Sequence, residues 1–307
     1  MVLNKKAVFF TLLAIAILSL FLISYSIYYT SENKKSINKR IETMNNFLFS
    51  LEKDLERQAY IAGFRSIFIF EKKITETGSP ISDVNSSFQE LFFNGTLYGI
   101  QEQLMQDVRF SDIQNSLSNR ARKINVEISL TEPKVYIIQE NPWQIKIKLE
   151  TQLFAKDRGE LAFWNKTEIT SAFISIENFE DPLYMINTNG LVTNKINRTN
   201  YEPFVSGTNV ENLTKHLENS YYINSILAPS FLDRLEGKTN ANANGIESLV
   251  YLPKLSAQGI SIQDKSSVDY IYFSTNNPSA NKIQNMPSWF KIDDAHLDIY
   301  KAGGLII

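Results

Sequence analysis

The chain has 307 residues, of which 43% are hydrophobic and 21% charged, and its formal net charge at pH 7 is −2. A near-neutral chain without a local basic stripe does not favour nucleic acid as a partner. Cysteine is absent, so disulfides and cysteine-ligated metals are excluded, and an exported domain has to be stabilised by its own hydrophobic core.

The first predicted element is a membrane-spanning helix over residues 7–31, a segment of 25 residues without a charge. A helix rises about 1.5 Å per residue, so roughly 20 apolar residues cross the hydrocarbon core of a bilayer. Tyr28 and Tyr29 near its end are typical of the aromatic belt at a membrane interface. The alternative is a cleaved secretory signal with a cleavage site at Ser24–Ser26, but an apolar stretch of this length favours an uncleaved anchor.

The expected topology is a single pass through the cell membrane, with a cytoplasmic N-terminus and an extracytoplasmic remainder. Asn4, Lys5 and Lys6 precede the apolar segment, and further basic residues follow it within residues 34–40. Because long domains translocate largely regardless of such charges, the early basic start decides the orientation. The cytoplasmic tail would then have six residues, too few for a catalytic or signalling domain, so any signal would cross the membrane through a partner protein.

Residues 32–79 are expected to form an amphipathic helical stalk. Its apolar residues have the spacing of a heptad seam. This heptad seam consists of Ile37, Ile41, Met44, Leu48, Leu51 and Leu55. Two interpretations fit: the helix lies on the protein's own globular domain, or it packs against other subunits as a short coiled coil. Residues 7–77 contain no proline, so one helix is expected to run from the membrane through the stalk.

Residues 80–180 begin with a predicted helical region. Gly78-Ser79-Pro80 ends the stalk, because glycine and proline interrupt helices. Ser87 and Glu90 have the spacing of a capping box and are expected to open the next helix. This helical region is interrupted at Asn94-Gly95 and extends to Arg122.

An alternation of apolar and polar residues follows, which is the pattern of half-buried strands. It covers residues 124–130 and 135–137, then 143–153, and then 169–176, with a turn at 157–159. Such segments separated by turns predict an antiparallel β-meander with one buried face.

Residues 181–307 have a mixed pattern. The predicted helices are 210–221 and 231–236, the predicted loop is the asparagine-rich segment 238–245, and the predicted strands are 246–252, 268–274 and 297–300. The fold class is therefore α+β, in four parts: a membrane anchor (1–31), an amphipathic helical stalk (32–79), a helical segment with the β-meander (80–180), and a mixed α+β C-terminal domain (181–307).

One cluster near the C-terminus resembles a metal site. On the predicted strand, Asp294, His296 and Asp298 would point to one face and offer oxygen and nitrogen ligands. The alternative is a polar outward face beside an apolar face made by Leu297 and Ile299, and this alternative is the expected one.

Other candidate motifs have structural explanations. Ser288 and Lys291 match the Ser-x-x-Lys of penicillin-recognising serine enzymes, but the companion Ser-Asp-Asn and Lys-Thr-Gly motifs are missing. Glu180 and Asp181 precede Pro182 and are expected to shape a turn. The sequence has no P-loop, dinucleotide fingerprint, nucleophile elbow or zincin histidine pair. It therefore predicts no catalytic residue, no metal ligand and no cofactor.

The order of elements resembles the plan of type IV pilins and pseudopilins. Lys5-Lys6-Ala7 resembles the charged and small residues before the prepilin peptidase cut, and Phe10-Thr11-Leu12-Leu13 resembles the Phe-Thr-Leu start of mature pilins. Leu12 stands where that family has a glutamate. The passage 181–190 also resembles archaeal single-pass surface proteins with pilin-like N-termini. The resemblance implies an apolar helix buried in a filament core and a sheet that faces outward.

These observations predict a non-enzymatic, pilin-like structural or assembly component at the cell surface. Its expected partners are the lipid bilayer and other protein subunits, including copies of itself, that bind through the N-terminal helix. The alternative is a membrane-anchored extracytoplasmic ligand-binding or sensor module. A third hypothesis is an anchored hydrolase that uses the face of Asp294, His296 and Asp298.

Overall fold

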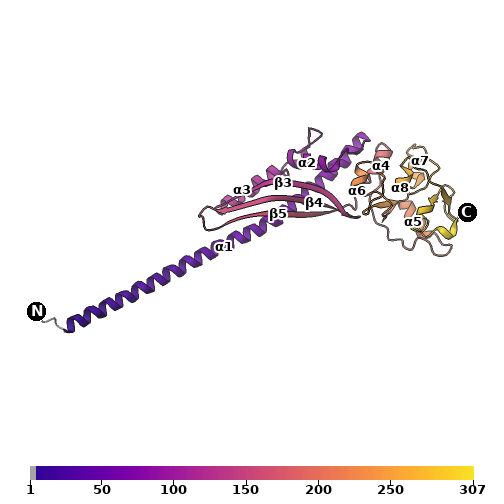
Figure 1. Ribbon diagram of the computed structural model, residues 1–307. Helices are drawn as coiled ribbons and strands as arrows, with labels where there is room; N and C mark the ends of the chain where they lie inside the picture. Colours follow the sequence, from indigo (N-terminus) through magenta and orange to yellow (C-terminus); the bar gives the residue numbers. More distant parts are fainter. Residues whose placement is uncertain (1–4) are drawn as a thin grey trace.

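The N-terminal helix dominates the molecule (Figure 1), and the computed structural model describes residues 5–307. Helix α1, Lys5–Thr77, has 73 residues and is about 110 Å long at 1.5 Å per residue. Its first half projects away from the rest of the chain, and its second half lies along the sheet. The prediction of one uninterrupted helix is confirmed. Asn4 lies outside the described residues, as do the side chains of residues 5–7.

The sheet beside α1 has three antiparallel strands in the order β3-β4-β5. Their bounds are Val126–Asn141 for β3, Gln144–Asp157 for β4 and Phe163–Ser175 for β5. On β4 the alternate residues from Ile145 to Asp157 are buried, and their neighbours on the other face are not. This period of two is the reason why the sequence pattern identified the strand.

Two strands differ from their predicted lengths. The predicted segments 124–130 and 135–137 belong to one strand, because a register shift between Thr131 and Lys134 lets β3 continue past Pro133. Strand β5 begins at Phe163 rather than Ile169, because its first half pairs fully with β4 although it lacks an alternating apolar pattern. The predicted turn at 157–159 is present between β4 and β5.

Helices α2 (Val84–Asn94) and α3 (Phe110–Lys123) contact β3, and α1 contacts β4 and β5. All three helices cover the buried face of the sheet. Helix α2 begins earlier than predicted, because Asp83 caps it by accepting a hydrogen bond from the Ser86 backbone N–H at 2.9 Å. The predicted interruption after Asn94 is confirmed, since Gly95 ends α2 with a φ of 73°. Short elements β1 (Thr96–Leu97), β2 (Ile100–Gln101) and η1 (Gln103–Met105) connect α2 to α3.

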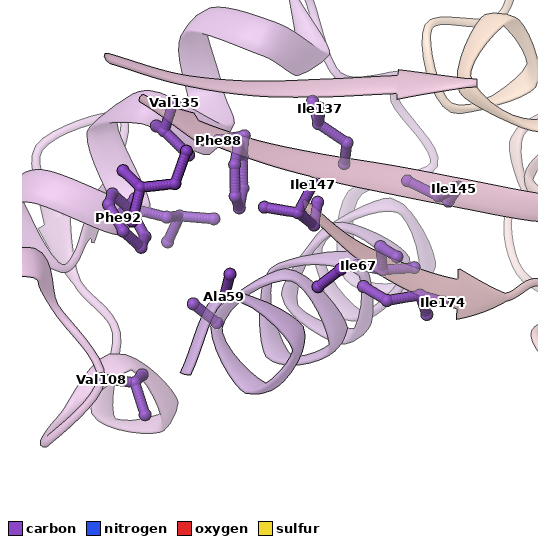
Figure 2. Close-up of a cluster of buried hydrophobic side chains, with 14 of the residues drawn as sticks. Ala59, Ile67, Phe88, Phe92, Val108, Val135, Ile137, Ile145, Ile147 and Ile174 are labelled. Carbon is purple, nitrogen blue, oxygen red and sulfur yellow. The ribbon is translucent and has the colours of Figure 1, made fainter. Parts of the chain in front are cut away.

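The heptad seam of α1 is part of this protein's own core from Met44 onward. Met44, Leu48, Leu51 and Leu55 are each at most 6% exposed. Figure 2 shows the continuation of the same helix face, where Ala59 and Ile67 lie toward Ile147 and Ile174 of the sheet. The interpretation that this helix lies on the protein's own globular domain is therefore correct for these residues. The coiled-coil interpretation is wrong for these residues, because the sheet already covers them.

Helix α1 lies close to the sheet at Gly63. A Cβ atom at this position would overlap the side chains of Ile147 and Ile174. Glycine is unfavourable inside helices by roughly 0.5–1 kcal/mol relative to alanine. Here the absence of a side chain lets the helix backbone rest directly on the core.

The C-terminal region consists of short elements. They are α4 (Pro182–Asn187), α5 (Glu211–Asn219), β6 (Tyr222–Asn224), α6 (Phe231–Leu235), β7 (Ile246–Ser248), α7 (Leu252–Ala257), α8 (Asp269–Tyr272), β8 (Ala280–Lys282), β9 (Lys291–Asp293), η2 (Asp294–His296) and η3 (Gly303–Leu305). Antiparallel pairs form between β6 and β7 and between β8 and β9. The chain is thus α+β with a long apolar N-terminal helix and antiparallel sheets, as predicted.

The predictions for this region are only partly correct. Helices α5 and α6 and the loop 238–245 lie where the sequence placed them. The predicted strand 246–252 ends at Ser248, the predicted strand 268–274 contains helix α8, and the predicted strand 297–300 is a series of turns. Residues 265–272 are buried on every side, so their burial has no period of two, and a short apolar run cannot by itself distinguish helix from strand.

Candidate functional site

The first half of α1 exposes an apolar surface of unusual extent. Its large apolar side chains are between 40% and 71% exposed. They are Val8, Phe9, Phe10, Leu12, Leu13, Ile15, Ile17, Leu18, Leu20, Phe21, Leu22, Ile23, Tyr25, Ile27, Tyr28 and Tyr29. Among the described residues, α1 is the one helix long and apolar enough to cross a membrane. Patches this large mark contact with a membrane or with other proteins.

Three polar side chains in this segment are satisfied within the helix. The hydroxyl groups of Thr11, Ser19 and Thr30 each donate a hydrogen bond of 2.8 Å to a backbone carbonyl three or four residues earlier. An unsatisfied polar group is costly in hydrocarbon, and this local bonding removes that cost. These three hydroxyl groups are therefore compatible with an apolar surrounding.

The second half of α1 carries an aromatic stripe, defined here as Phe49, Tyr60, Phe64 and Phe68. These four side chains are between 42% and 59% exposed, although the heptad seam on the same helix is buried. The rings of Tyr60 and Phe64 stack with centroids 6.2 Å apart. Spacings of 4 and 11 residues place the stripe along one line of the helix. The seam and the stripe are thus two separate faces: the sheet covers the seam, and the stripe is about half exposed, with Phe64 also packed against Phe179 at 5.3 Å between ring centroids.

A buried ionic cluster surrounds His296. The ring nitrogen Nδ1 of His296 lies 2.7 Å from an oxygen of Asp293, and Nε2 lies 3.0 Å from the hydroxyl of Tyr270. Nε2 is also 3.4 Å from a carboxylate oxygen of Glu247. Both carboxylates and the ring are buried. This cluster holds η2 and β9 against β7 and α8.

The predicted face of Asp294, His296 and Asp298 does not form. These residues lie in η2 and the turn after it, where Asp294 and Asp298 are exposed and His296 is 1% exposed. A 3₁₀ turn directs successive side chains around the axis, whereas the prediction assumed the alternation of a strand. The expected polar outward face is wrong for the same reason, because His296 points into the protein.

The electrostatics of the cluster do not suit general base catalysis. Burial alone would lower the pKa of His296, but the hydrogen bond with Asp293 and the Glu247 carboxylate outweigh it and raise the pKa to about 9. The ring is therefore a protonated imidazolium at neutral pH, with both nitrogens occupied. The Ser266 hydroxyl lies 2.7 Å from Asp293 and donates to it. Within the described residues, this arrangement pairs no nucleophile with a free base.

A second buried network, which sequence reasoning missed, surrounds Arg234. The guanidinium is fully buried and donates hydrogen bonds to Asp181 at 2.6 Å and to Asp269 at 2.9 Å. The hydroxyl of Tyr222 donates to Asp181 at 2.7 Å. Asp181 also caps α4 through the Leu183 backbone N–H at 2.8 Å, whereas its position before Pro182 had predicted only a turn. No pattern in the sequence identified Arg234 or Asp269, because the partners of each are distant in sequence.

The remaining candidates are separated or neutral. Ser288 is exposed, and Lys291 forms an ion pair with Asp264 at 2.6 Å, so the Ser-x-x-Lys residues do not form a site. His216 is buried between Phe204 and Tyr300, and burial lowers its pKa to about 3. It is therefore a neutral core residue.

Comparisons of the chain with protein-family models, with curated proteins and with solved structures find no match. Within residues 5–307, no group of three or more histidine, aspartate or glutamate side chains is placed to hold a metal ion. Among the described residues, the most extensive exposed apolar surface lies on α1, in its first half and in the aromatic stripe.

Proposed function

We propose that this protein is a non-enzymatic, single-pass cell-surface protein of pilin-like architecture. Helix α1 anchors it in the membrane and joins it to other subunits of an envelope assembly, and the α+β region is displayed outside the cell. The observation that carries this proposal is the continuity of α1, whose exposed apolar half runs without a break into the half packed on an antiparallel sheet.

Membrane insertion of the first half of α1 is energetically favourable. The exposed Val, Leu, Ile and Phe residues each contribute about −0.3 to −0.6 kcal/mol at the centre of a membrane helix. About a dozen such residues give a total of about 4–8 kcal/mol in favour of insertion. The orientation follows from the early basic residues, which favour a cytoplasmic N-terminus.

Lipid alone does not account for the aromatic stripe. Phe49 lies 18 residues after Ser31, which is about 27 Å along a helix and outside the hydrocarbon. The stripe therefore needs a protein surface to remove its rings from water, and a neighbouring subunit provides one. The outer face of the sheet exposes Phe154, Ile169 and Phe173 beside charged residues such as Lys146 and Glu150, so it is a second surface that a neighbouring subunit can cover.

Site-specific crosslinking tests the assembly. The chain has no native cysteine, so Phe64→Cys introduces one attachment point for a benzophenone maleimide in the stripe. We expect illumination in native membranes to give crosslinked species through Phe64→Cys. The control is Asp298→Cys in the exposed turn after η2, which should stay uncrosslinked. A protein that remains monomeric with both probes refutes the assembly role.

Mass spectrometry of the mature N-terminus distinguishes three ways in which the N-terminal segment can be processed. A new N-terminus at Val8 indicates prepilin-type processing, and an intact Met1 indicates a plain anchor. An N-terminus near Ile27 indicates a cleaved secretory signal and contradicts the proposed membrane helix.

One observation favours the alternative, a ligand-binding or sensor module. A cavity of about 540 Å³, a size typical of small-molecule sites, lies beside the His296 cluster and is lined by Leu227, Tyr270 and Asn276 among others. A bound ligand would raise the melting temperature of the protein. The full chain in detergent is the right sample, because a fragment from residue 80 would lack the core residues that α1 supplies.

A further inference from the structure

The turn between β4 and β5 exposes two large apolar side chains. Figure 1 shows this turn at the end of the sheet that points toward the projecting half of α1. Leu161 in the turn is 48% exposed, and Phe163, the first residue of β5, is 71% exposed. Phe163 is thus as open to solvent as Phe21 in the apolar segment of α1. Such a pair at the tip of a hairpin is an apolar surface for contact with another molecule or a membrane.

Arg40 fixes the position of this turn relative to α1. Its guanidinium donates hydrogen bonds to Asp157 at 2.6 Å and to the backbone carbonyls of Ile124 and Asn125 at 2.6 and 3.1 Å. Asp157 in turn accepts a hydrogen bond from the Leu161 backbone N–H at 3.3 Å. The turn and the end of α3 are therefore attached directly to the helix that carries the apolar segment.

The side chains around this turn are predominantly cationic. We define the proximal end of the domain as residues 32–40 of α1, 122–127 at the end of α3, and 156–163 of the β4–β5 turn. These ranges contain eight lysine or arginine residues and four aspartate or glutamate residues, a net charge of +4. Glu42, the next acid along α1, lowers this balance only to +3. The whole chain has a net charge of −2, so positive charge is concentrated at the proximal end.

Each acid of the proximal end already lies close to a cation. The N–O distances are 2.6 Å for Asp157 with Arg40, 2.9 Å for Glu160 with Lys156, 3.5 Å for Glu32 with Lys35 and 3.9 Å for Glu127 with Arg158. Four exposed cations of the proximal end form no ion pair with the described part of the chain: Lys34, Lys39, Arg122 and Lys123. These four groups are available to an anionic surface.

A bilayer is the surface that α1 would place next to the proximal end. Residues 7–31 span about 37 Å as a helix, whereas the hydrocarbon core is about 30 Å thick and has about 5–8 Å of headgroups on each side. A helix longer than the core tilts to accommodate the excess. Arg40, to which the turn is attached, lies about 14 Å along the helix from Ser31. A tilt toward the sheet therefore lowers the turn to the level of the headgroups.

The charge of the proximal end decides the kind of lipid. Cations are attracted to anionic headgroups, and this attraction falls off within a Debye length of about 8–10 Å. Apolar side chains beside lysine and arginine are the combination that binds at a lipid interface. We propose that the proximal end binds the headgroups of anionic phospholipids, with Leu161 and Phe163 inserted among them. This contact rests on the membrane helix proposed above and extends it to the domain.

Fluorescence quenching in nanodiscs that each hold one copy of the full chain tests this contact. The chain has no native cysteine, so Leu161→Cys takes a single nitrobenzoxadiazole label. We expect quenching by a nitroxide on the lipid headgroup to be at least about twofold stronger in discs that contain phosphatidylglycerol than in discs of phosphatidylcholine alone. About 1 M salt, at which the Debye length is about 3 Å, should remove this difference. A label at Glu140→Cys, exposed near the opposite end of the sheet, should stay unquenched in both lipids.

Two pairs of substitutions remove cations from the proximal end: Arg122→Gln with Lys123→Gln, and Lys34→Gln with Lys39→Gln. Each pair should reduce the difference between the two lipids at least about twofold, because it removes two of the four available cations. The first pair lies on the packed domain, so circular dichroism checks its fold, whereas the second lies on an exposed stretch of α1. The matched control, Lys72→Gln with Lys73→Gln, removes the same charge further along α1 and should leave the difference unchanged.

Three results overturn the proposal: equal quenching in both lipids, a difference that both cation-removing pairs leave unchanged, or a blue shift of the label only when several copies share one vesicle. The last result identifies a protein partner instead of lipid. A label at Ser26→Cys in the apolar segment separates this proposal from membrane insertion itself. Quenching at Ser26→Cys without quenching at Leu161→Cys overturns the lipid contact alone, whereas labels that are unquenched at both positions contradict the membrane helix as well.

Discussion

Two substitutions two residues apart on α1 separate the role of its seam from that of its stripe. Leu51 is fully buried against the sheet, and Phe49 is 59% exposed. Leu51→Ala removes a core side chain and leaves a cavity, which costs about 2–5 kcal/mol. Phe49→Ala removes a ring already largely in solvent, so it should change the free energy of unfolding of the isolated subunit by about 0.5 kcal/mol or less.

Thermal unfolding in detergent, followed by near-UV circular dichroism, measures both effects. For a domain of this size, each kcal/mol shifts the melting temperature by about 2–4 °C, so a loss of about 3 kcal/mol corresponds to about 6–12 °C. We expect this decrease for Leu51→Ala and almost none for Phe49→Ala. In membranes the order should reverse, with Phe49→Ala reducing the crosslinking yield at Phe64→Cys. A melting temperature that falls equally in both variants refutes the division of α1 into two faces.

Three further predictions concern buried charges. Arg234→Met should destabilise the subunit by about 3–5 kcal/mol, because it leaves two buried carboxylates without their cation, and chemical denaturation measures it. The folded-state pKa of His296 is raised to about 9, so the contribution of its charged form to the free energy of unfolding is complete below about pH 6.5 and is lost as the pH rises through about 9. His296→Phe should therefore flatten this part of a profile of stability against pH. An unchanged profile contradicts this prediction. Burial also raises the folded-state pKa of Glu71 to about 8, so ionised Glu71 destabilises the fold above pH 8; Glu71→Gln should therefore raise the melting temperature relative to the wild type above pH 8, and equal values contradict the burial cost.

The sequence was sufficient for elements with long, regular patterns. Helix α1 was predictable because no proline interrupts it and its seam repeats from Ile37 to Leu55. The alternation on β4 was equally clear, since every second residue from Ile145 faces the helices. Periodicity reports which side of an element is buried, and these elements each have one buried side and one open side.

The C-terminal region lacks that asymmetry. Asp269 sits in an apolar run and looks like the outward residue of a strand, yet its carboxylate turns inward to Arg234 and to the Ser248 backbone N–H at 3.0 Å. Its partner Arg234 is 35 residues away in sequence. Pairing over such a distance leaves no local pattern. The same holds for Glu71 and Glu180, which line one cavity only because α1 packs beside the segment after β5.

Arg40 connects α1 to the sheet near the point where the exposed first half of the helix ends. This side chain donates to Asp157 at 2.6 Å and to the backbone carbonyl of Ile124 at 2.6 Å, so it connects α1 to the near end of the sheet. Arg40 lies nine residues after Ser31, which places the domain about 14 Å along the helix from the apolar segment. Residues 32–39 are exposed and include three lysines, which suits a layer of lipid headgroups or a neighbouring subunit. In the proposed assembly, the continuous helix would fix the height of the domain above the membrane, and that height would determine which faces of adjacent subunits meet.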